Sequence, residues 1–201
     1  MNFATYKIRI ASEIEPLSVM EKVAICLVCC RRLAPLYTEF VRIEKWGDES
    51  PFCQCREESI KVLSGQCDSM SITTDVLDLL IPDTEDFGTF HGSFALNAGL
   101  SHLGLINQVN STDSSPTIDA LLMCYSTIDF CVQQALDPEC SRSVPLSDID
   151  AHPMMIQEIQ FQLASIDRVR GCSELVQFAN IDSKESELSS FMLSTIAANG
   201  G

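Results

Sequence analysis

The chain has 201 residues, of which 46% are hydrophobic, so it is long enough for one domain with a sizeable core. Its 28 acidic residues against 13 basic ones give a formal net charge of −15. This charge argues against binding to nucleic acid or to an anionic membrane surface, because both require clustered basic residues. It fits a protein that uses its charge for solubility or that attracts a basic protein partner.

The first residues, MNFATYKIRIASEIEP, lack the apolar segment of a secretory signal. No apolar run reaches the roughly 20 residues of a membrane span. We therefore expect a cytoplasmic protein. In that reducing compartment the ten cysteines, which are scattered from Cys26 to Cys172, are expected to be free thiols.

Apolar residues follow helical spacing along nearly the whole chain, and no run shows the alternation of a strand. The first predicted helix covers residues 18–37, and Pro35 is expected either to kink it or to open a second short helix. Residues 46–48 have the composition of a turn. The next helix is predicted over 51–63, with Ser50 as its N-cap.

A short amphipathic helix is predicted at 71–80, and a central helix with three glycines at 90–109. Between them, Asp83 and Asp86 resemble a capping arrangement for the helix that follows. A polar linker then leads to a helix over 117–136, which begins at Ser115-Pro116.

The region before Pro153 is predicted to be an irregular loop, and Pro153 itself to lie in the first turn of a long helix. The sequence thus predicts an all-α, single-domain bundle of about six to eight helices over residues 1–180. Residues 181–201 are expected to form a polar tail that holds a short helix at 186–196.

The stretch VAICLVCC contains three cysteines, with Cys26 and Cys29 at the spacing of a redox or zinc pair. A reactive pair normally lies at a helix N-terminus, whereas these cysteines lie in the middle of a predicted helix. We therefore interpret them as packing residues. Cys26 and Cys30 fall on the apolar stripe and should be buried, while Cys29 falls at its flank and should be the most accessible of the three.

The three histidines do not suggest a metal site either. His91 and His102 share a helix face, but three helical turns separate them by about 16 Å. His152 precedes a proline at a predicted helix start, a common position for a capping residue. No metalloprotease, Gly-rich phosphate-loop or nucleophile-elbow motif occurs, so the sequence predicts no catalytic residue, no metal and no cofactor.

Acidic residues gather in two short stretches that flank predicted helices. Most of them are explained by helix capping and solvated loops. They also provide the candidate docking surface for a basic protein partner, which consists of Asp48, Glu49, Asp83, Glu85 and Asp86.

Three segments carry a resemblance to a known family: LSVMEKVAICLVCCRRLAPLYTEF with WGDES, LLIPDTEDFGTFHGSFALNAGLSHLGLINQV, and HPMMIQEIQFQLASI. Together they resemble the YjaG-like bacterial family, which is defined only as a domain of unknown function. The positions that match are Pro35, Tyr37, Phe40, Gly47, Asp48, Ile81, Pro82, Asp86, Phe87, the segment 95–103, the segment 126–130, Pro153, Glu158 and Gln162.

The resemblance covers residues 13–175 and rests on the order of these motifs. This chain departs from the family pattern in its larger number of cysteines, its glycine-rich central helix and its serine-rich tail. The resemblance implies an all-helical bacterial cytosolic protein, and it transfers no catalytic residues.

The acidic charge and the lack of catalytic motifs predict a non-catalytic protein-binding domain. Its most specific form is an immunity-type protein that binds and neutralises a basic toxin or effector. Two alternatives stay open: an accessory protein in bacterial signalling or regulation, and an enzyme whose Cys and His groups meet only in the fold.

Overall fold

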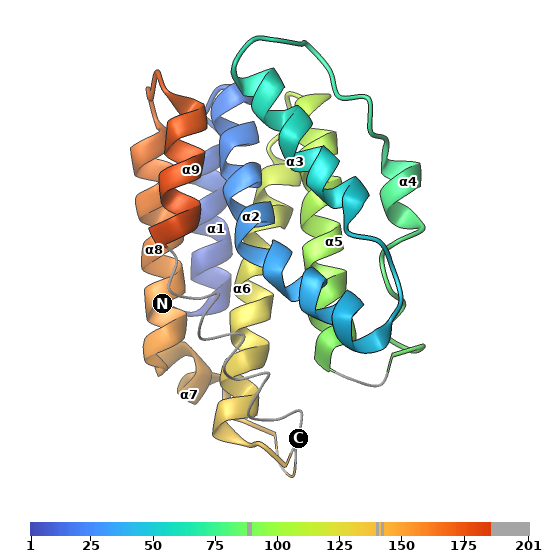
Figure 1. Cartoon of the computed structure of the whole chain (residues 1–201). Coiled ribbons are helices and arrows are strands. Elements are labelled where there is room, and N and C mark those ends of the chain that lie inside the picture. The colour runs from blue at the N-terminus through green and yellow to red at the C-terminus, as the bar shows by residue number, and fades with distance from the viewer. Residues whose placement is uncertain (88–89, 140, 142, 186–201) are drawn as a thin grey trace.

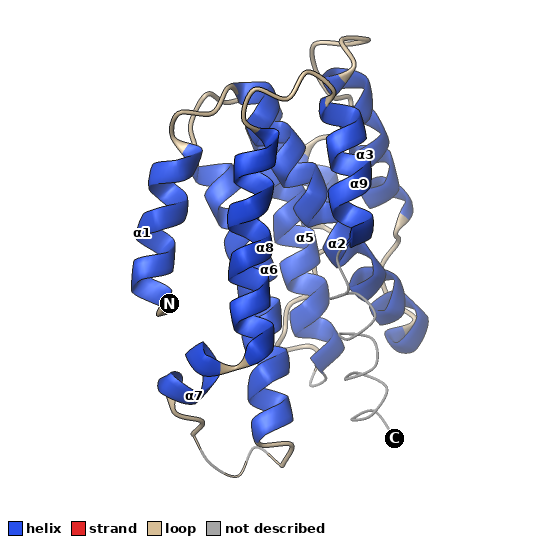
Figure 2. Cartoon of the chain, turned by 90° about the vertical axis from the view of Figure 1, so that its left-hand side faces the viewer, coloured by secondary structure: helices blue, strands red, loops and turns tan. Residues whose placement is uncertain are grey.

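Figure 1 shows the computed structural model, which describes residues 1–87, 90–139, 141 and 143–185. This part of the chain is all-α and contains no strand, as predicted (Figure 2). Its nine helices exceed the expected six to eight. They are α1 (Phe3–Ile14), α2 (Val19–Glu44), α3 (Ser50–Leu63), α4 (Thr74–Asp78), α5 (Phe90–Val109), α6 (Ser115–Leu136), α7 (Leu146–Ala151), α8 (Pro153–Val169) and α9 (Leu175–Glu185).

Helix α2 is the centre of the bundle. It packs most extensively against α5 and also contacts α3, α6, α8 and α9, so neighbours lie on several of its sides (Figure 1). Every residue from Lys22 to Cys30 is buried as a result. Cys26 and Cys30 are buried as predicted, but the prediction for Cys29 was wrong, since only 1% of it is exposed. The spacing of apolar residues predicts which side of a helix is buried, but it does not show that neighbouring helices cover its other sides.

Pro35 bends α2 without ending it. The helix is continuous from Val19 to Glu44, and Figure 1 shows that it changes direction midway. Proline lacks the N–H that would bond to the carbonyl four residues earlier, which relaxes the helix at this point. The kink is therefore confirmed, and no separate helix opens at Pro35.

Local signals explain where the helices start. Ser18 and Glu21 form a reciprocal capping box at the start of α2. Proline lies in the first turn of α3, α6 and α8. The ring of His152 accepts a hydrogen bond from the Met154 amide, which confirms its capping position. Ser50, however, lies inside α3, and Glu49 occupies the N-cap position.

Other boundaries differ from the predictions. The helix expected at 71–80 is limited to Thr74–Asp78, and the loop before Pro153 contains α7. Asp83 accepts a hydrogen bond from the Glu85 amide, in a turn that precedes Phe87. Helix α9 continues past residue 180, where a tail was expected, and the helix predicted at 186–196 lies outside the described residues.

A buried polar network crosses the core. Arg32 of α2 and Glu158 of α8 form a two-pronged ion pair, with N–O distances of 3.0 and 2.5 Å. Gln162, one turn further along α8, donates to Glu158 at 2.5 Å and to the Leu121 carbonyl of α6 at 3.1 Å. The Tyr6 hydroxyl of α1 donates to the Gln162 side-chain oxygen. Four helices are thus joined through one set of hydrogen bonds.

Replacing Glu158 with glutamine should strongly destabilise the fold, because it removes the carboxylate that pairs with the buried Arg32 charge. We expect a loss of about 3–5 kcal/mol in the free energy of unfolding, measured by urea denaturation. Glu13, which pairs with Arg170 near the surface, provides the control, and its change to glutamine should cost about 0–1 kcal/mol. Equal losses in the two variants would show that the buried pair has no special role.

Candidate functional site

The five predicted acidic residues lie on two loops that the fold brings side by side. The link between the loops is aromatic: Trp46 follows α2, Phe87 precedes α5, and their ring centroids are 5.3 Å apart. Phe40 packs against both rings, at 5.8 and 5.0 Å. We call the surface above this cluster the acidic corner; its members, all exposed, are Asp48, Glu49, Asp83, Glu85 and Asp86.

The turn that enters this corner depends on Gly47. Its φ of +88° lies in the left-handed region, and an added Cβ would come within 2.7 Å of the Tyr37 hydroxyl. That hydroxyl in turn donates to the Leu80 carbonyl at 2.7 Å, which ties the loop after α4 to α2. The two halves of the acidic corner are therefore held in place by buried contacts.

Some carboxylates of the corner already have local roles. Asp48 accepts from the Ser50 amide at 2.9 Å, and this hydrogen bond lowers the pKa of the Asp48 carboxyl. Glu49 accepts from the Thr38 hydroxyl at 2.6 Å. Within the described residues none of the five forms an ion pair, so their negative charges are not balanced by neighbouring cations.

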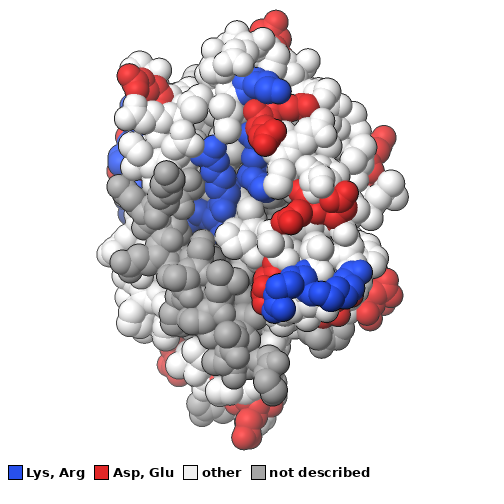
Figure 3. Space-filling view, viewed as in Figure 1, with Lys and Arg blue, Asp and Glu red and all other residues white. Residues whose placement is uncertain are grey.

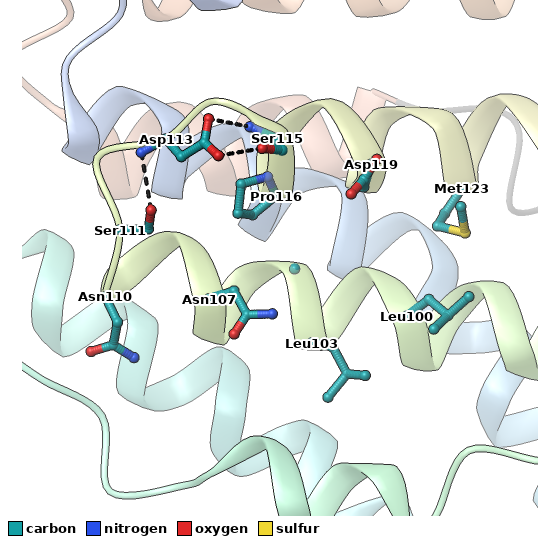
Figure 4. A pocket seen from close by; sticks show the side chains of 11 residues that line it. Leu100, Leu103, Asn107, Asn110, Ser111, Asp113, Ser115, Pro116, Asp119 and Met123 are labelled. Carbon is teal, nitrogen blue, oxygen red and sulfur yellow. Dashed lines mark hydrogen bonds between the residues drawn. The ribbon is translucent and has the colours of Figure 1, made fainter.

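A second feature, which the sequence did not predict, is a hollow of about 620 Å³ between α5 and α6 (Figure 4). We call it the α5–α6 hollow. One side is formed by α5 and the other by the start of α6 and the linker before it. Its lining consists of Leu100, Leu103, Gly104, Asn107, Asn110, Ser111, Asp113, Ser115, Pro116, Asp119 and Met123.

The two helices approach closely along this hollow because Gly104 lies at their contact. A Cβ there would lie 3.0 Å from the Pro116 carbonyl oxygen, which belongs to the backbone and cannot easily move. Asn107 lies on α5 and Asn110 directly after its end, and both side chains line the hollow. Glycine at position 104 therefore sets the separation of the two walls.

The polar end of the hollow is organised by Asp113. Its carboxylate accepts from the Ser114 amide at 2.6 Å and from both the amide and the hydroxyl of Ser115, at 3.3 and 2.5 Å. The hydroxyl of Ser115 is the main cause of the lowered pKa of Asp113. No described group bonds to the carboxylate of Asp119, which is exposed on the first turns of α6. Asp119 is therefore available to an incoming cation.

Four of the buried cysteines are not arranged for reactivity. Burial raises the pKa of the Cys26 and Cys30 thiols well above the usual value, and it raises the pKa of Cys55 and Cys131 to about 12. A buried thiol of this kind stays protonated and is a poor nucleophile. Among the described residues no three metal-ligating side chains lie close enough together to hold an ion.

His102 is buried between α5 and α3. Its Nδ1–H donates to the Ala98 carbonyl at 2.7 Å, and its Nε2 accepts from the Arg56 guanidinium at 2.9 Å. Both contacts fit a neutral ring. His91 is also buried, at 8% exposure, and neither of its ring nitrogens has a hydrogen-bond partner in the described part of the chain. The two histidines make no common site.

Comparison with known proteins identifies a family but no activity. A family model described as "Protein of unknown function (DUF416)" matches residues 9–190. The crystal structure of a DUF416 family protein from Shewanella baltica OS155 aligns with a TM-score of 0.71 and 18% sequence identity. The alignment covers 87% of this chain and 93% of that one. No curated protein matches.

These findings confirm the resemblance to a bacterial family of unknown function. The likeness to the solved structure shows a common fold and carries no functional residue. The matched region extends to residue 190 and so includes α9, which the sequence resemblance had left out. None of the described helices has the length and apolar character needed to cross a membrane.

The neutral, buried state of His102 should make stability depend on pH. Burial, reinforced by the charge of Arg56, lowers the pKa of His102 from 6.5 to about 3. Between these values the unfolded chain binds a proton that the folded chain does not, so stability falls as the pH falls. For each unit that the pH falls below 6.5, the free energy of unfolding of the wild type should decrease by about 1.4 kcal/mol more than that of His102→Gln.

The slope of the free energy of unfolding against pH is measured by urea denaturation. The pH values lie between 6.5 and the range where carboxylates titrate. Asn107→Gln is the control, since it changes an exposed amide that binds no proton, and its slope should match that of the wild type. If His102→Gln has the wild-type slope too, His102 is not held neutral in the folded protein.

Proposed function

The chain belongs to the DUF416 family of proteins of unknown function, and from that premise we propose that it is a non-catalytic protein that binds a basic protein partner. The observation that carries the proposal is the lining of the α5–α6 hollow. Its eleven residues include two carboxylates and two side-chain amides but no Lys, Arg or His. A hollow of one charge sign concentrates cations in front of it.

The hollow also offers apolar surface. Leu100 is 38% exposed, and Leu103, Pro116 and Met123 are only partly buried. A lysine or arginine side chain likewise combines an apolar part, its aliphatic stem, with a charged head. The stem would pack on the leucines and on the flexible Met123, while the head would reach the unpartnered carboxylate of Asp119. A basic side chain of a protein partner fits both properties of the hollow.

The overall charge supports the same occupant. Acidic residues outnumber basic ones by 28 to 13, and Arg32, Arg42, Arg168 and Arg170 already pair with carboxylates of this chain. The remaining field is negative and accelerates the approach of a positive partner. In this proposal the acidic corner contributes to steering, and the α5–α6 hollow provides the anchoring contact.

The state of the cysteines supports binding over catalysis. Burial raises the pKa of the Cys26, Cys30 and Cys55 thiols, and a protonated thiol lacks the activation that covalent catalysis needs. Within the class of binding proteins, an immunity-type role that neutralises a basic toxin or effector suits a compact acidic domain. In such a role affinity depends on surface contacts alone, as in the arrangement proposed above.

The anchoring role of Asp119 can be tested by a matched pair of charge reversals. Asp119→Lys places a cation in the hollow, and Glu57→Lys makes the same change of net charge on the exposed face of α3. Tagged wild type and both variants are used to capture proteins from the native host at low salt, and the captured proteins are identified by mass spectrometry. A basic protein should be retained by wild type and Glu57→Lys and lost by Asp119→Lys.

The affinity between the purified chain and its captured partner then measures how large the effect of each substitution is. Asp119→Lys should weaken binding by about 2–5 kcal/mol, because it removes one partner of a desolvated charge pair and introduces repulsion. Glu57→Lys should change it by less than about 1 kcal/mol. Equal losses in both variants would mean that net charge alone drives capture, and an acidic or neutral partner would contradict the proposal.

The acidic corner should affect the rate of association more than the lifetime of the complex. Asp86→Lys changes an exposed carboxylate at the rim of the corner, away from the hollow. Stopped-flow or surface-based kinetics with the captured partner should show slower association at low salt and an unchanged dissociation rate. Faster dissociation would indicate that the corner itself contacts the partner.

A further inference from the structure

A second hollow, of about 560 Å³, lies at the bend of α2 and has the opposite charge character. It opens beside Pro35, where α2 turns away from its first direction (Figure 1). Figure 3 shows basic side chains next to one another near the middle of this face. The lining consists of Arg31, Ala34, Pro35, Thr38 and Glu39 from α2 and Arg56 from α3.

Among the described residues the two arginines of this hollow donate to an amide, an imidazole ring and a sulfur atom. Arg31 donates to the side-chain oxygen of Asn180 at 2.6 Å. Arg56 donates to Nε2 of His102 at 2.9 Å and to the Cys53 sulfur at 3.1 Å. Within the described residues neither guanidinium has a carboxylate within 4.0 Å, whereas four other arginines do. In a chain of net charge −15, two cations that pair with no described carboxylate therefore face one hollow.

The two guanidinium groups also act on each other. Burial lowers the pKa of Arg31, and the positive charge of Arg56 lowers it further. Like charges at close range repel, so their placement side by side costs free energy in the empty protein. An anion between them removes that cost and accepts hydrogen bonds from both forks.

The carboxylate of Glu39, which lies at the edge of the hollow, does not fulfil this role. It is held by Arg42 one turn away, through bonds of 2.8 and 2.6 Å to the guanidinium. The hydrogen bond from Arg42 is the main cause of the lowered pKa of Glu39. Its charge is thus already balanced on the outer side of α2.

We propose that this hollow binds the phosphate group of a small phosphomonoester. A phosphomonoester carries a charge of about −1.5 to −2 at neutral pH, which matches two guanidinium groups. Its oxygens accept the paired N–H groups of arginine in a fork geometry. The hollow is much larger than a phosphate ion, and the apolar surface of Ala34 and Pro35 leaves room for the organic part of the ligand.

The site is separate from the proposed protein-binding surface. None of its lining residues belongs to the α5–α6 hollow or to the acidic corner. The bend at Pro35 connects it to the central helix, and Arg56 connects it to the buried ring of His102. Phosphate binding can therefore be measured on the full chain without any partner.

The test uses inorganic phosphate and ribose 5-phosphate as probes, followed by calorimetry and by the shift in thermal midpoint. Ribose without phosphate, and chloride at equal ionic strength, are the ligand controls. Arg31→Gln keeps a donor for Asn180 but removes one charge of the hollow. Arg9→Gln makes the same change of net charge on exposed α1. We expect saturable binding by wild type and Arg9→Gln, and an affinity at least about tenfold lower in Arg31→Gln.

A second variant keeps the test decisive if Arg31→Gln is poorly folded. Glu39→Gln removes the one carboxylate at the edge of the hollow, so it should bind phosphate more tightly than the wild type. The proposal is overturned if the wild type shows no saturable binding, if Arg31→Gln loses less than about tenfold, or if Glu39→Gln binds no more tightly.

Discussion

The ion pair between Arg32 and Glu158 is the constraint on which the rest of the bundle depends. Both side chains are almost completely withdrawn from solvent, at 2% and 0% exposure. A charge in such a place is tolerated only when a partner and further hydrogen bonds satisfy it. The guanidinium also lies over the ring of Phe161, 4.3 Å from its centroid. Helices α2 and α8 can therefore pack in this register but not in one that separates the pair.

The same network explains why the first helix belongs to the core. Tyr6 of α1 is fully buried, donates to Gln162 and stacks on Tyr125 of α6 at 4.9 Å. Burial raises the pKa of its hydroxyl, which therefore stays protonated and remains a donor. With arginine used inside the core and other arginines paired at the surface, the carboxylates dominate the outer surface. Arg31 and Arg56, which line the hollow at Pro35, are exceptions to this distribution.

The all-helical class, the bend at Pro35 and the burial of Cys26 and Cys30 could be predicted because each depends on local spacing or on one residue type. Helix α1 was missed, although Tyr6, Ile10 and Ile14 have the spacing of an apolar stripe and are all fully buried. Helix α7 was missed because its six residues carry little periodic signal. The accessibility of Cys29 was predicted wrongly because burial on several sides of α2 depends on its neighbours.

The candidate sites also differ in how much of each could be predicted from the sequence. The acidic corner was predicted residue by residue, but its two loops are joined by Trp46 and Phe87, which lie 41 positions apart in the sequence numbering. The α5–α6 hollow and the pairing of Arg31 with Arg56 depend on helix packing, so no sequence spacing indicates them. Glu158 and Gln162 were noted only as part of a family resemblance. Their spacing of one helical turn is a usable signal, since two polar residues on an otherwise apolar stripe predict a buried partner.

In this structure the Arg32–Glu158 pair fixes the packing of the core. A double-mutant cycle with Arg32→Met and Glu158→Leu, measured by urea denaturation, tests it most directly. We expect each single variant to be strongly destabilised and the double variant to recover most of the loss, because the double variant buries neither charge. Additive losses in the double variant would contradict the claim.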